Sequence, residues 1–323
     1  MQGVLPFVVR RLLWAPFVLL AVSLATFALG RFGPGDPVEI LQGQYNNPEV
    51  VERIRQQRGL DDPFFTQYGR YMWDALHGDL GTSVTYQGTP VRDIIFDKFW
   101  VTIQYNLIVL VIIFAIGIPV GIWAALRQGT WQDPFTISVF LFFQSIPVLV
   151  TIPILQFILA VKLGWLPSSG WVEKDIFGLK VGIFDKRIIM PVLAMSLPGI
   201  AGIARLMRSQ TLEVLDQDFV RTARAKGLQE FVVVTQHVAR NALLPMTTMV
   251  GFALVSLLGG SLFVETLFGI PGIGQFIWKA VFNRDYDVIM AVTLIVATAF
   301  IVANLITDIA YSFIDPRVRL QGG

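Results

Sequence analysis

Hydrophobic positions along the chain form six long runs that contain no charged side chain. A helix needs roughly 20 residues to cross a hydrocarbon core of ~30 Å, and the runs approach or exceed this length. They lack the alternation of strands and are too long for barrel strands, so they predict an all-α integral membrane protein with six transmembrane helices. The runs are Leu12–Leu29, Trp100–Leu126, Pro134–Val161, Ile188–Ala204, Asn241–Val264 and Val288–Thr307.

The composition is typical of a membrane protein and argues against several other classes of protein. Hydrophobic residues make up 54% of the 323 residues and charged residues 15%, whereas a soluble domain carries about 25% charged residues. A net charge of +2 gives no reason to expect nucleic acid as a partner. The chain has no cysteine, and its two histidines, His77 and His237, lie outside the runs and far apart. We therefore expect no metal site and no intramembrane protease.

Basic residues suggest how the helices are oriented. An even number of spans places both termini on one side, and the terminal arginines, which are Arg10, Arg11, Arg317 and Arg319, favour the cytoplasm. The loop 162–187, predicted to lie outside, also carries five basic residues, which opposes this orientation. No small-residue cleavage site follows the first run, so we expect it to be a retained helix rather than a secretory signal.

The spacing of the runs divides the chain into four parts. We expect residues 1–30 to hold the N-terminus and first helix, 31–98 an extracytoplasmic segment, 99–310 a five-helix core, and 311–323 a cytoplasmic C-terminus. In the second part, the stretch Pro48–Arg58 is predicted to be helical. The aromatic residues of the 31–98 segment have two interpretations, as anchors at the bilayer interface or as contacts for an external partner. They are Phe64, Phe65, Tyr68, Tyr71 and Trp73.

Two helices are predicted to meet at a glycine between the fourth and fifth runs. Leu212–Lys226 forms the first, Gly227 occupies the left-handed position that ends it, and the second starts near Gln229 and continues towards Asn241. The first helix mixes basic and apolar residues. It is therefore either a membrane-surface helix that meets anionic headgroups, or part of a helix pair that enters a groove on a partner protein.

Polar residues inside the runs are candidates for a translocation pathway, foremost Gln144, Ser145 and Asn304. Such residues equally serve as hydrogen-bonding partners between helices; this alternative also covers Gln104, Asn106 and Gln156. The runs hold no charged residue, which argues against an ion-coupled carrier. A secondary transporter that works alone remains the second hypothesis.

Asp218–Gly227, followed by His237–Pro245, resembles the EAA loop of ABC importer permeases, in the form used by the dipeptide, oligopeptide and nickel branch. Arg221, Thr222 and Ala223 replace the Glu-Ala-Ala of the general pattern, Gly227 is retained, and Arg240 replaces a proline. Further stretches resemble the B-type subunit of peptide permeases, and the resemblance covers nearly the whole chain. They are Gly33–Pro37, Gly59–Pro63, Gly78–Ser83 and Glu265–Gly274.

The resemblance implies a type I ABC importer permease fold in a bacterial inner membrane. It implies a homologous second permease subunit, two ABC ATPase subunits, an extracytoplasmic substrate-binding protein and a lipid environment. Peptides are the implied substrate, with nickel or a glutathione-like solute as alternatives. Coupling to the ATPase is implied for the predicted coupling loop 212–245, through Phe219, Val220, Arg221, Thr222, Ala223, Arg224, Lys226 and Gly227.

The chain itself lacks the means to bind ATP through a phosphate loop. No Gly-Lys pair occurs in the sequence, so the Walker A motif is absent. We therefore expect no enzymatic activity and no cofactor on this chain, with ATP and magnesium held by the partner subunits.

Overall fold

The computed structural model describes residues 4–33, 59, 61–83, 85–86, 88–246, 249–250, 253 and 261–314. Within these residues, four apolar helices are long enough to cross a membrane: Leu12–Phe32, Val91–Leu126, Lys186–Leu215 and Tyr286–Ile306. A fifth candidate is a bent helix pair. The all-α membrane fold is confirmed. The predicted fifth span, Asn241–Val264, is interrupted by 11 residues that lie outside the described ones, and the predicted helix Pro48–Arg58 lies wholly outside them.

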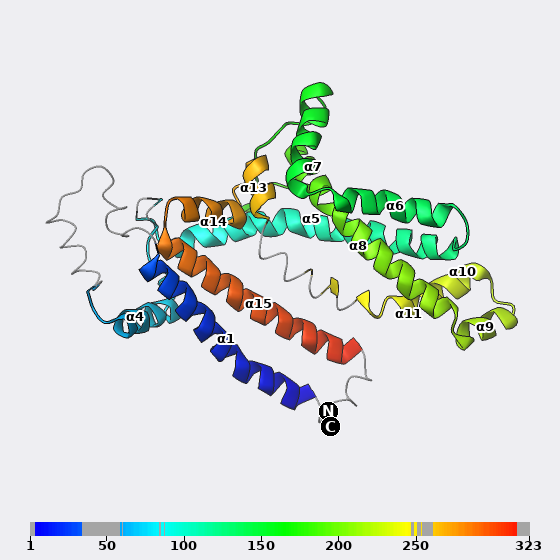
Figure 1. Ribbon diagram of the computed structural model, residues 1–323, viewed down its shortest axis with the longest axis horizontal. Coiled ribbons are helices and arrows are strands. Elements are labelled where there is room, and N and C mark those ends of the chain that lie inside the picture. The colour runs from blue at the N-terminus through cyan, green and yellow to red at the C-terminus, as the bar shows by residue number, and fades with distance from the viewer. Residues whose placement is uncertain are drawn as a thin grey trace.

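The first and last helices lie side by side (Figure 1). Helix α1 (Val4–Phe32) and helix α15 (Tyr286–Ile314) run in opposite directions, because Gly30 near the end of α1 lies against Tyr286 and Met290 at the start of α15. The start of α1 and the end of α15 are therefore at the same end of the pair, as an even number of spans requires.

The most extensive helix packing among the described residues joins α5 (Val91–Leu126) to α8 (Ile189–Leu215). Gly117 and Gly121 of α5, four residues apart, face α8. A Cβ at Gly121 would lie 2.5 Å from the carbonyl oxygen of Ala204 and 2.6 Å from Cβ of Met207. Small residues at this spacing let two helix backbones approach closely inside a membrane.

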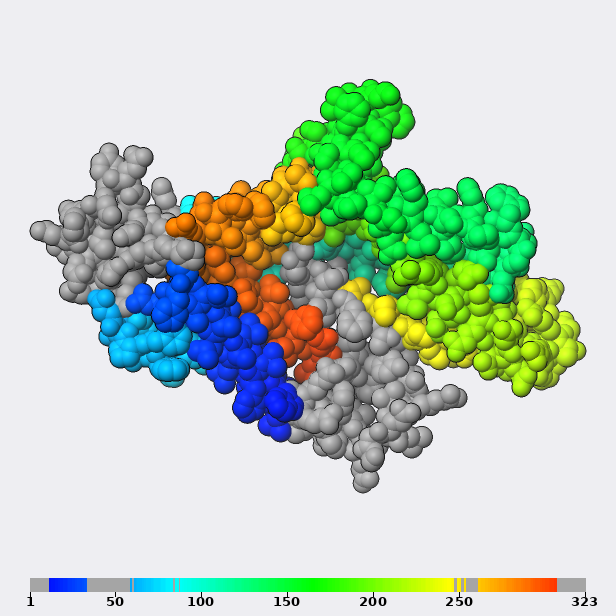
Figure 2. Space-filling model, in the orientation of Figure 1, coloured from blue at the N-terminus to red at the C-terminus, as the bar shows by residue number. Residues whose placement is uncertain are grey.

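The predicted third span is bent. Helix α6 (Gln132–Ser145) and the pair α7 (Val148–Leu155) and η1 (Gln156–Lys162) meet at 95°. The break falls where Ile146 adopts an extended conformation before Pro147, since a residue before proline is disfavoured in a helix. In Figures 1 and 2, α7 and η1 project away from the other helices.

Short elements complete the ends of the bundle. The hairpin of β1 (Lys174–Ile176) and β2 (Leu179–Val181) is antiparallel and turns at Phe177 and Gly178, which both have positive φ. In Figure 1, α4 and α14 lie at one end of the molecule, and α9, α10 and α11 at the other. The remaining helices are α4 (Phe64–Leu76), η2 (Lys186–Ile188), α9 (Asp218–Ala225), α10 (Glu230–Val232), η3 (Val233–Ala239), α11 (Arg240–Ala242), α13 (Leu262–Phe268) and α14 (Ile273–Phe282).

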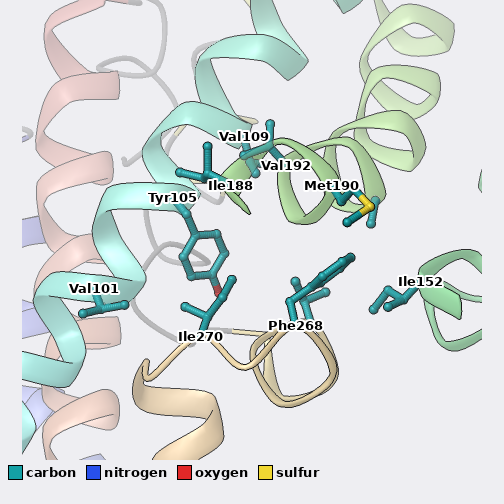
Figure 3. Packing of buried hydrophobic residues seen from close by; sticks show 11 residues of the cluster. Val101, Tyr105, Val109, Ile152, Ile188, Met190, Val192, Phe268 and Ile270 are labelled. Atoms are coloured by element: carbon teal, nitrogen blue, oxygen red, sulfur yellow. The ribbon is translucent and has the colours of Figure 1, made fainter. Parts of the chain in front are cut away.

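The largest apolar core joins α5, α8, α7 and α13 (Figure 3). Tyr105 of α5 and Phe268 of α13 are its bulkiest members and are almost completely buried. A second core packs the first turns of α5 against α14 and α15. These two cores fix the turn between α13 and α14 on the side of α5.

Candidate functional site

The 212–245 segment folds as an elbow whose first arm is shorter than predicted. Helix α8 continues to Leu215, and the chain then breaks at Gln217, which is extended at φ −73° and ψ 145°. Helix α9 begins at Asp218 and covers 8 residues. The predicted continuous helix Leu212–Lys226 is therefore wrong at this break, whereas the second arm, Glu230–Ala242, follows the prediction.

Gly227 is the bend of the elbow and has the predicted left-handed conformation, with φ +78°. The backbone N–H of Leu228 reaches back to the carbonyl of Ala223, and that of Gly227 to the carbonyl of Arg224. These bonds satisfy carbonyls that the end of a helix otherwise leaves open. A Cβ at Gly227 would meet nothing within 4 Å. The glycine is thus needed for its backbone conformation and not for space.

The elbow has a small apolar core of its own. Val220 and Ala223 of α9 are buried against Val233 and Val238 of the second arm. This burial corrects the expectation that Val220 and Ala223 couple to the ATPase by direct contact: their side chains hold the two arms together. The sequence did not show this, because either face of a short amphipathic helix can point inwards.

An ion pair crosses the bend. The guanidinium of Arg224 donates two hydrogen bonds to the carboxylate of Glu230, of 2.7 Å and 3.2 Å. These bonds lower the pKa of Glu230 from its usual value. Arg224 is therefore engaged inside the segment, and Glu230 is a member of the site that the sequence interpretation did not name.

The outward surface of the elbow combines basic and apolar side chains. Arg221, Thr222 and Lys226 are exposed, and Phe219 is 42% exposed. Arg221 lies 3.6 Å from the carboxylate of Asp218, in a pair that is open to solvent. Phe231, 76% exposed, adds an apolar residue to this surface. Phe231 was not among the predicted coupling residues, although an aromatic residue in the first turn of the second arm could have indicated it.

The three predicted pathway residues lie on two different helices. Gln144 and Ser145 are exposed at the end of α6, beside the bend of the third span. The amide nitrogen of Gln144 lies 4.0 Å from the position of a Cβ at Gly202 of α8. Asn304 is half-buried on α15, which packs against α1. The structure therefore groups Gln144 with Ser145 and leaves Asn304 on another helix pair.

Other polar residues of the spans make structural hydrogen bonds. The amide of Gln104 donates to the carbonyl of Lys180 and accepts from the N–H of Gly182, which ties the hairpin to α5. The amide of Gln156 donates to the carbonyls of Ser168 and Leu267. The bond from Gln156 to Leu267 joins two helices, as that interpretation expects, whereas Gln104 binds the hairpin and not a helix.

A buried carboxylate that the sequence interpretation passed over lies at the turn between α13 and α14. Oε1 of Glu265 accepts hydrogen bonds from the hydroxyls of Thr102 and Tyr105, and Oε2 accepts from the N–H of Gln275. Thr102 in turn accepts from the N–H of Ile273. Glu265 thereby caps the first turn of α14 from the preceding helix and binds both helices to α5.

Family models match most of the chain. One, described as the binding-protein-dependent transport system inner membrane component, matches residues 117–320. The other, its N-terminal counterpart, matches residues 4–106. The chain belongs to this family. It is accordingly an integral inner-membrane permease subunit of an ABC importer, a class of protein that is not an enzyme.

Several relatives align with this transport component over almost its full length. The dipeptide transport system permease protein DppB of Alkalihalophilus pseudofirmus is 36% identical and aligns over 98% of this chain and 99% of its own. The oligopeptide transport system permease protein AppB of Bacillus subtilis is 36% identical, over 97% and 99%. The oligopeptide transport system permease protein OppB of Haemophilus influenzae is 35% identical, over 98% and 99%.

A solved structure shows the same fold over about two thirds of the chain. An inward-facing form of the MetNI methionine ABC transporter aligns with a TM-score of 0.56 at 16% identity. The alignment covers 69% of this chain and 96% of that chain. The inner membrane component therefore has the type I permease fold.

Proposed function

We propose that this chain forms half of the translocation pathway of an ATP-driven importer that takes up di- and oligopeptides. The observation that carries the proposal is the full-length similarity to permeases named for dipeptide and oligopeptide transport. In this proposal a homologous permease forms the other half, and an extracytoplasmic binding protein delivers the peptide. Two ATPase subunits bind ATP and magnesium, and both termini of this chain face them in the cytoplasm.

The outward surface of the 212–245 segment is the proposed contact with an ATPase subunit. Phe219 and Phe231 supply apolar area, and Arg221 and Lys226 supply charges that select the partner and its orientation. Val220, Ala223 and the Arg224–Glu230 ion pair have a different task, because they are turned inwards or towards each other. They give the elbow one fixed shape, so that a displacement of α9 by the ATPase subunit moves both arms of the elbow together.

Helix α8 is the proposed path from the elbow to the spans. It runs 27 residues, about 40 Å at 1.5 Å per residue, from Ile189 to the break before α9. Near its elbow end, the guanidinium of Arg208 makes two hydrogen bonds to the carboxylate of Asp133 at the start of α6. Closing of the ATPase pair would therefore displace α8, α6 and α5 together and switch the pathway between its two openings.

The pathway is proposed to pass the bend of the third span, where Gln144 and Ser145 are exposed. Gln144 faces Gly202, and the small side of α8 at this point leaves room beside it. Asn304 is retained as a lining residue, contributed by α15. Amide and hydroxyl groups suit a solute with peptide bonds, because they both donate and accept hydrogen bonds.

The proposal is tested with the complete transporter in proteoliposomes. We expect uptake of labelled dipeptides and oligopeptides to require ATP, the ATPase subunits and the binding protein. We also expect the double variant R221E/K226E to lose the ATPase subunits on purification, while K174E, a charge reversal on the hairpin at the other end, retains them. Uptake by this chain alone would overturn the proposal. ATP-dependent uptake of nickel or a glutathione-like solute without peptide uptake would overturn its substrate class.

A further inference from the structure

Helix α4 presents three different faces around its circumference. Phe64, Tyr68 and Tyr71 lie on the face that packs on α1, with ring centroids 5.4–5.5 Å from that of Phe27. Phe65 and Leu76, 76% and 77% exposed, lie about 100° around the helix from the first face, since each residue advances about 100°. The remaining face is polar and exposed, and consists of Thr66, Arg70 and Asp74, with His77 following directly after the helix.

The depth of α4 follows from its contacts with α1. The hydroxyls of Tyr68 and Ser23 form a hydrogen bond of 2.8 Å, and Phe64 stacks on Phe32. Ser23 precedes Phe32 by nine residues, which is about 14 Å along the helix. Since the apolar window of α1 is Leu12–Phe32, α4 lies beside the half of the span that ends at Phe32 (Figures 1 and 2).

The exposed apolar face of α4 is continuous with the exposed apolar surface of α1. Leu29 and Phe32 of α1 are 71% and 77% exposed, as expected for side chains that meet acyl chains. Phe65 touches Phe64, which stacks on Phe32, so the exposed aromatic surface passes from one helix to the other without a break. Trp73, 64% exposed, stands between the apolar and polar faces, the place that tryptophan takes at a membrane interface.

We propose that α4 is an interfacial helix of the outer leaflet. Phe65 and Leu76 enter the acyl region beside α1, Trp73 lies at headgroup level, and the polar face meets headgroups and water. The occupant of the exposed face is therefore lipid, and the binding protein or the second permease does not cover it. Of the two interpretations that the aromatic residues allowed, the packing assigns Phe64, Tyr68 and Tyr71 to the protein and Phe65 and Trp73 to the bilayer.

The absence of cysteine from the chain makes the test direct. Single cysteines at Phe65, Trp73 and Leu76 carry a nitroxide label, and T66C and D74C are controls that are sequence neighbours on the polar face. The complete transporter, with cysteines removed from its other subunits, is placed in nanodiscs of phosphatidylethanolamine and phosphatidylglycerol. Power saturation then compares collision with oxygen, which enters lipid, and with a water-soluble nickel chelate.

We expect labels at 65 and 76 to collide severalfold more with oxygen than with the chelate, labels at 66 and 74 to show the reverse, and the label at 73 to be intermediate. Protection of 65 and 76 from both reagents would show a protein partner and overturn the proposal. Ready access of the chelate to 65 and 76 would show water and also overturn it. Two independent apolar positions keep the test decisive if one variant fails to assemble, and peptide uptake by the labelled transporters reports assembly.

Discussion

The hydroxyl of Tyr105 donates a hydrogen bond of 2.7 Å to Oε1 of Glu265, 160 residues further along the chain. Both side chains are buried, so neither partner has water as a substitute. Loss of one partner from a buried pair costs about 1–3 kcal/mol. This bond and that from Thr102 make Glu265 the point at which the turn between α13 and α14 is attached to α5.

We therefore expect Tyr105→Phe to lower the thermal unfolding temperature of the detergent-solubilised transporter. Glu265→Leu is expected to lower it further, because it leaves the two hydroxyls and the N–H of Gln275 without their common acceptor. Tyr86→Phe is the control, since Tyr86 is 36% exposed. Equal unfolding temperatures for Tyr105→Phe and the control would show that the bond contributes nothing to stability.

The bend at Gly227 allows a prediction that separates backbone conformation from space. Gly227→Val requires a left-handed valine, at a cost of about 1–2 kcal/mol. We expect normal membrane insertion but a marked loss of peptide uptake, because the two arms lose their fixed angle. Gly88→Val is a close control: Gly88 also has φ +78° and meets nothing within 4 Å. An equal effect of both variants on uptake would contradict a coupling role for Gly227.

The Arg224–Glu230 ion pair is tested by exchanging its charges. Arg224→Glu or Glu230→Arg alone places like charges across the bend and is expected to reduce coupled ATP hydrolysis. The double exchange is expected to restore much of it. Both side chains are about half exposed, so the pair contributes less than about 1 kcal/mol to stability. A double variant no more active than the single variants would assign these residues to partner contact instead.

The same pair has a defined pH dependence. The hydrogen bonds lower the pKa of Glu230 in the folded state, so its stabilisation is present above the unfolded pKa of about 4.3 and is lost as pH falls through the folded value. Thermal unfolding of the wild type and of Glu230→Gln should therefore differ at neutral pH and converge as pH falls through the lowered pKa of Glu230. A constant difference across that range would exclude the ionised carboxylate as the cause.

Close approach of α5 and α8 gives a prediction for the core. Gly121→Ala places a Cβ 2.5 Å from the carbonyl oxygen of Ala204, so the helices must separate. We expect destabilisation of about 1–3 kcal/mol, measured by thermal unfolding in detergent. Gly69→Ala is the control, because Gly69 is also helical and meets nothing within 4 Å. Its expected effect is neutral or stabilising by up to about 1 kcal/mol, and loss of stability there would remove the basis of the comparison.

Several features of the fold were predictable because they depend on local composition. The hydrocarbon core excludes charge, so uncharged runs mark helices α1, α5, α8 and α15 without knowledge of any contact. The left-handed conformation of Gly227 was also predictable from local sequence, because a helix often ends at a glycine in this conformation. The bend of the third span had a local signal in Pro147, but its angle of 95° had none.

The sequence by itself determined four of the spans, the place of the elbow and the resemblance to importer permeases, because each follows from residues close together in the chain. Only the tertiary structure decided which side chains face inwards. It buried Val220 and Ala223 within the elbow, joined Glu265 to Tyr105, and divided the aromatic residues of α4 between α1 and the outside. These outcomes depend on which distant segment packs against a given face, and a periodic pattern states that a face is apolar without stating what covers it.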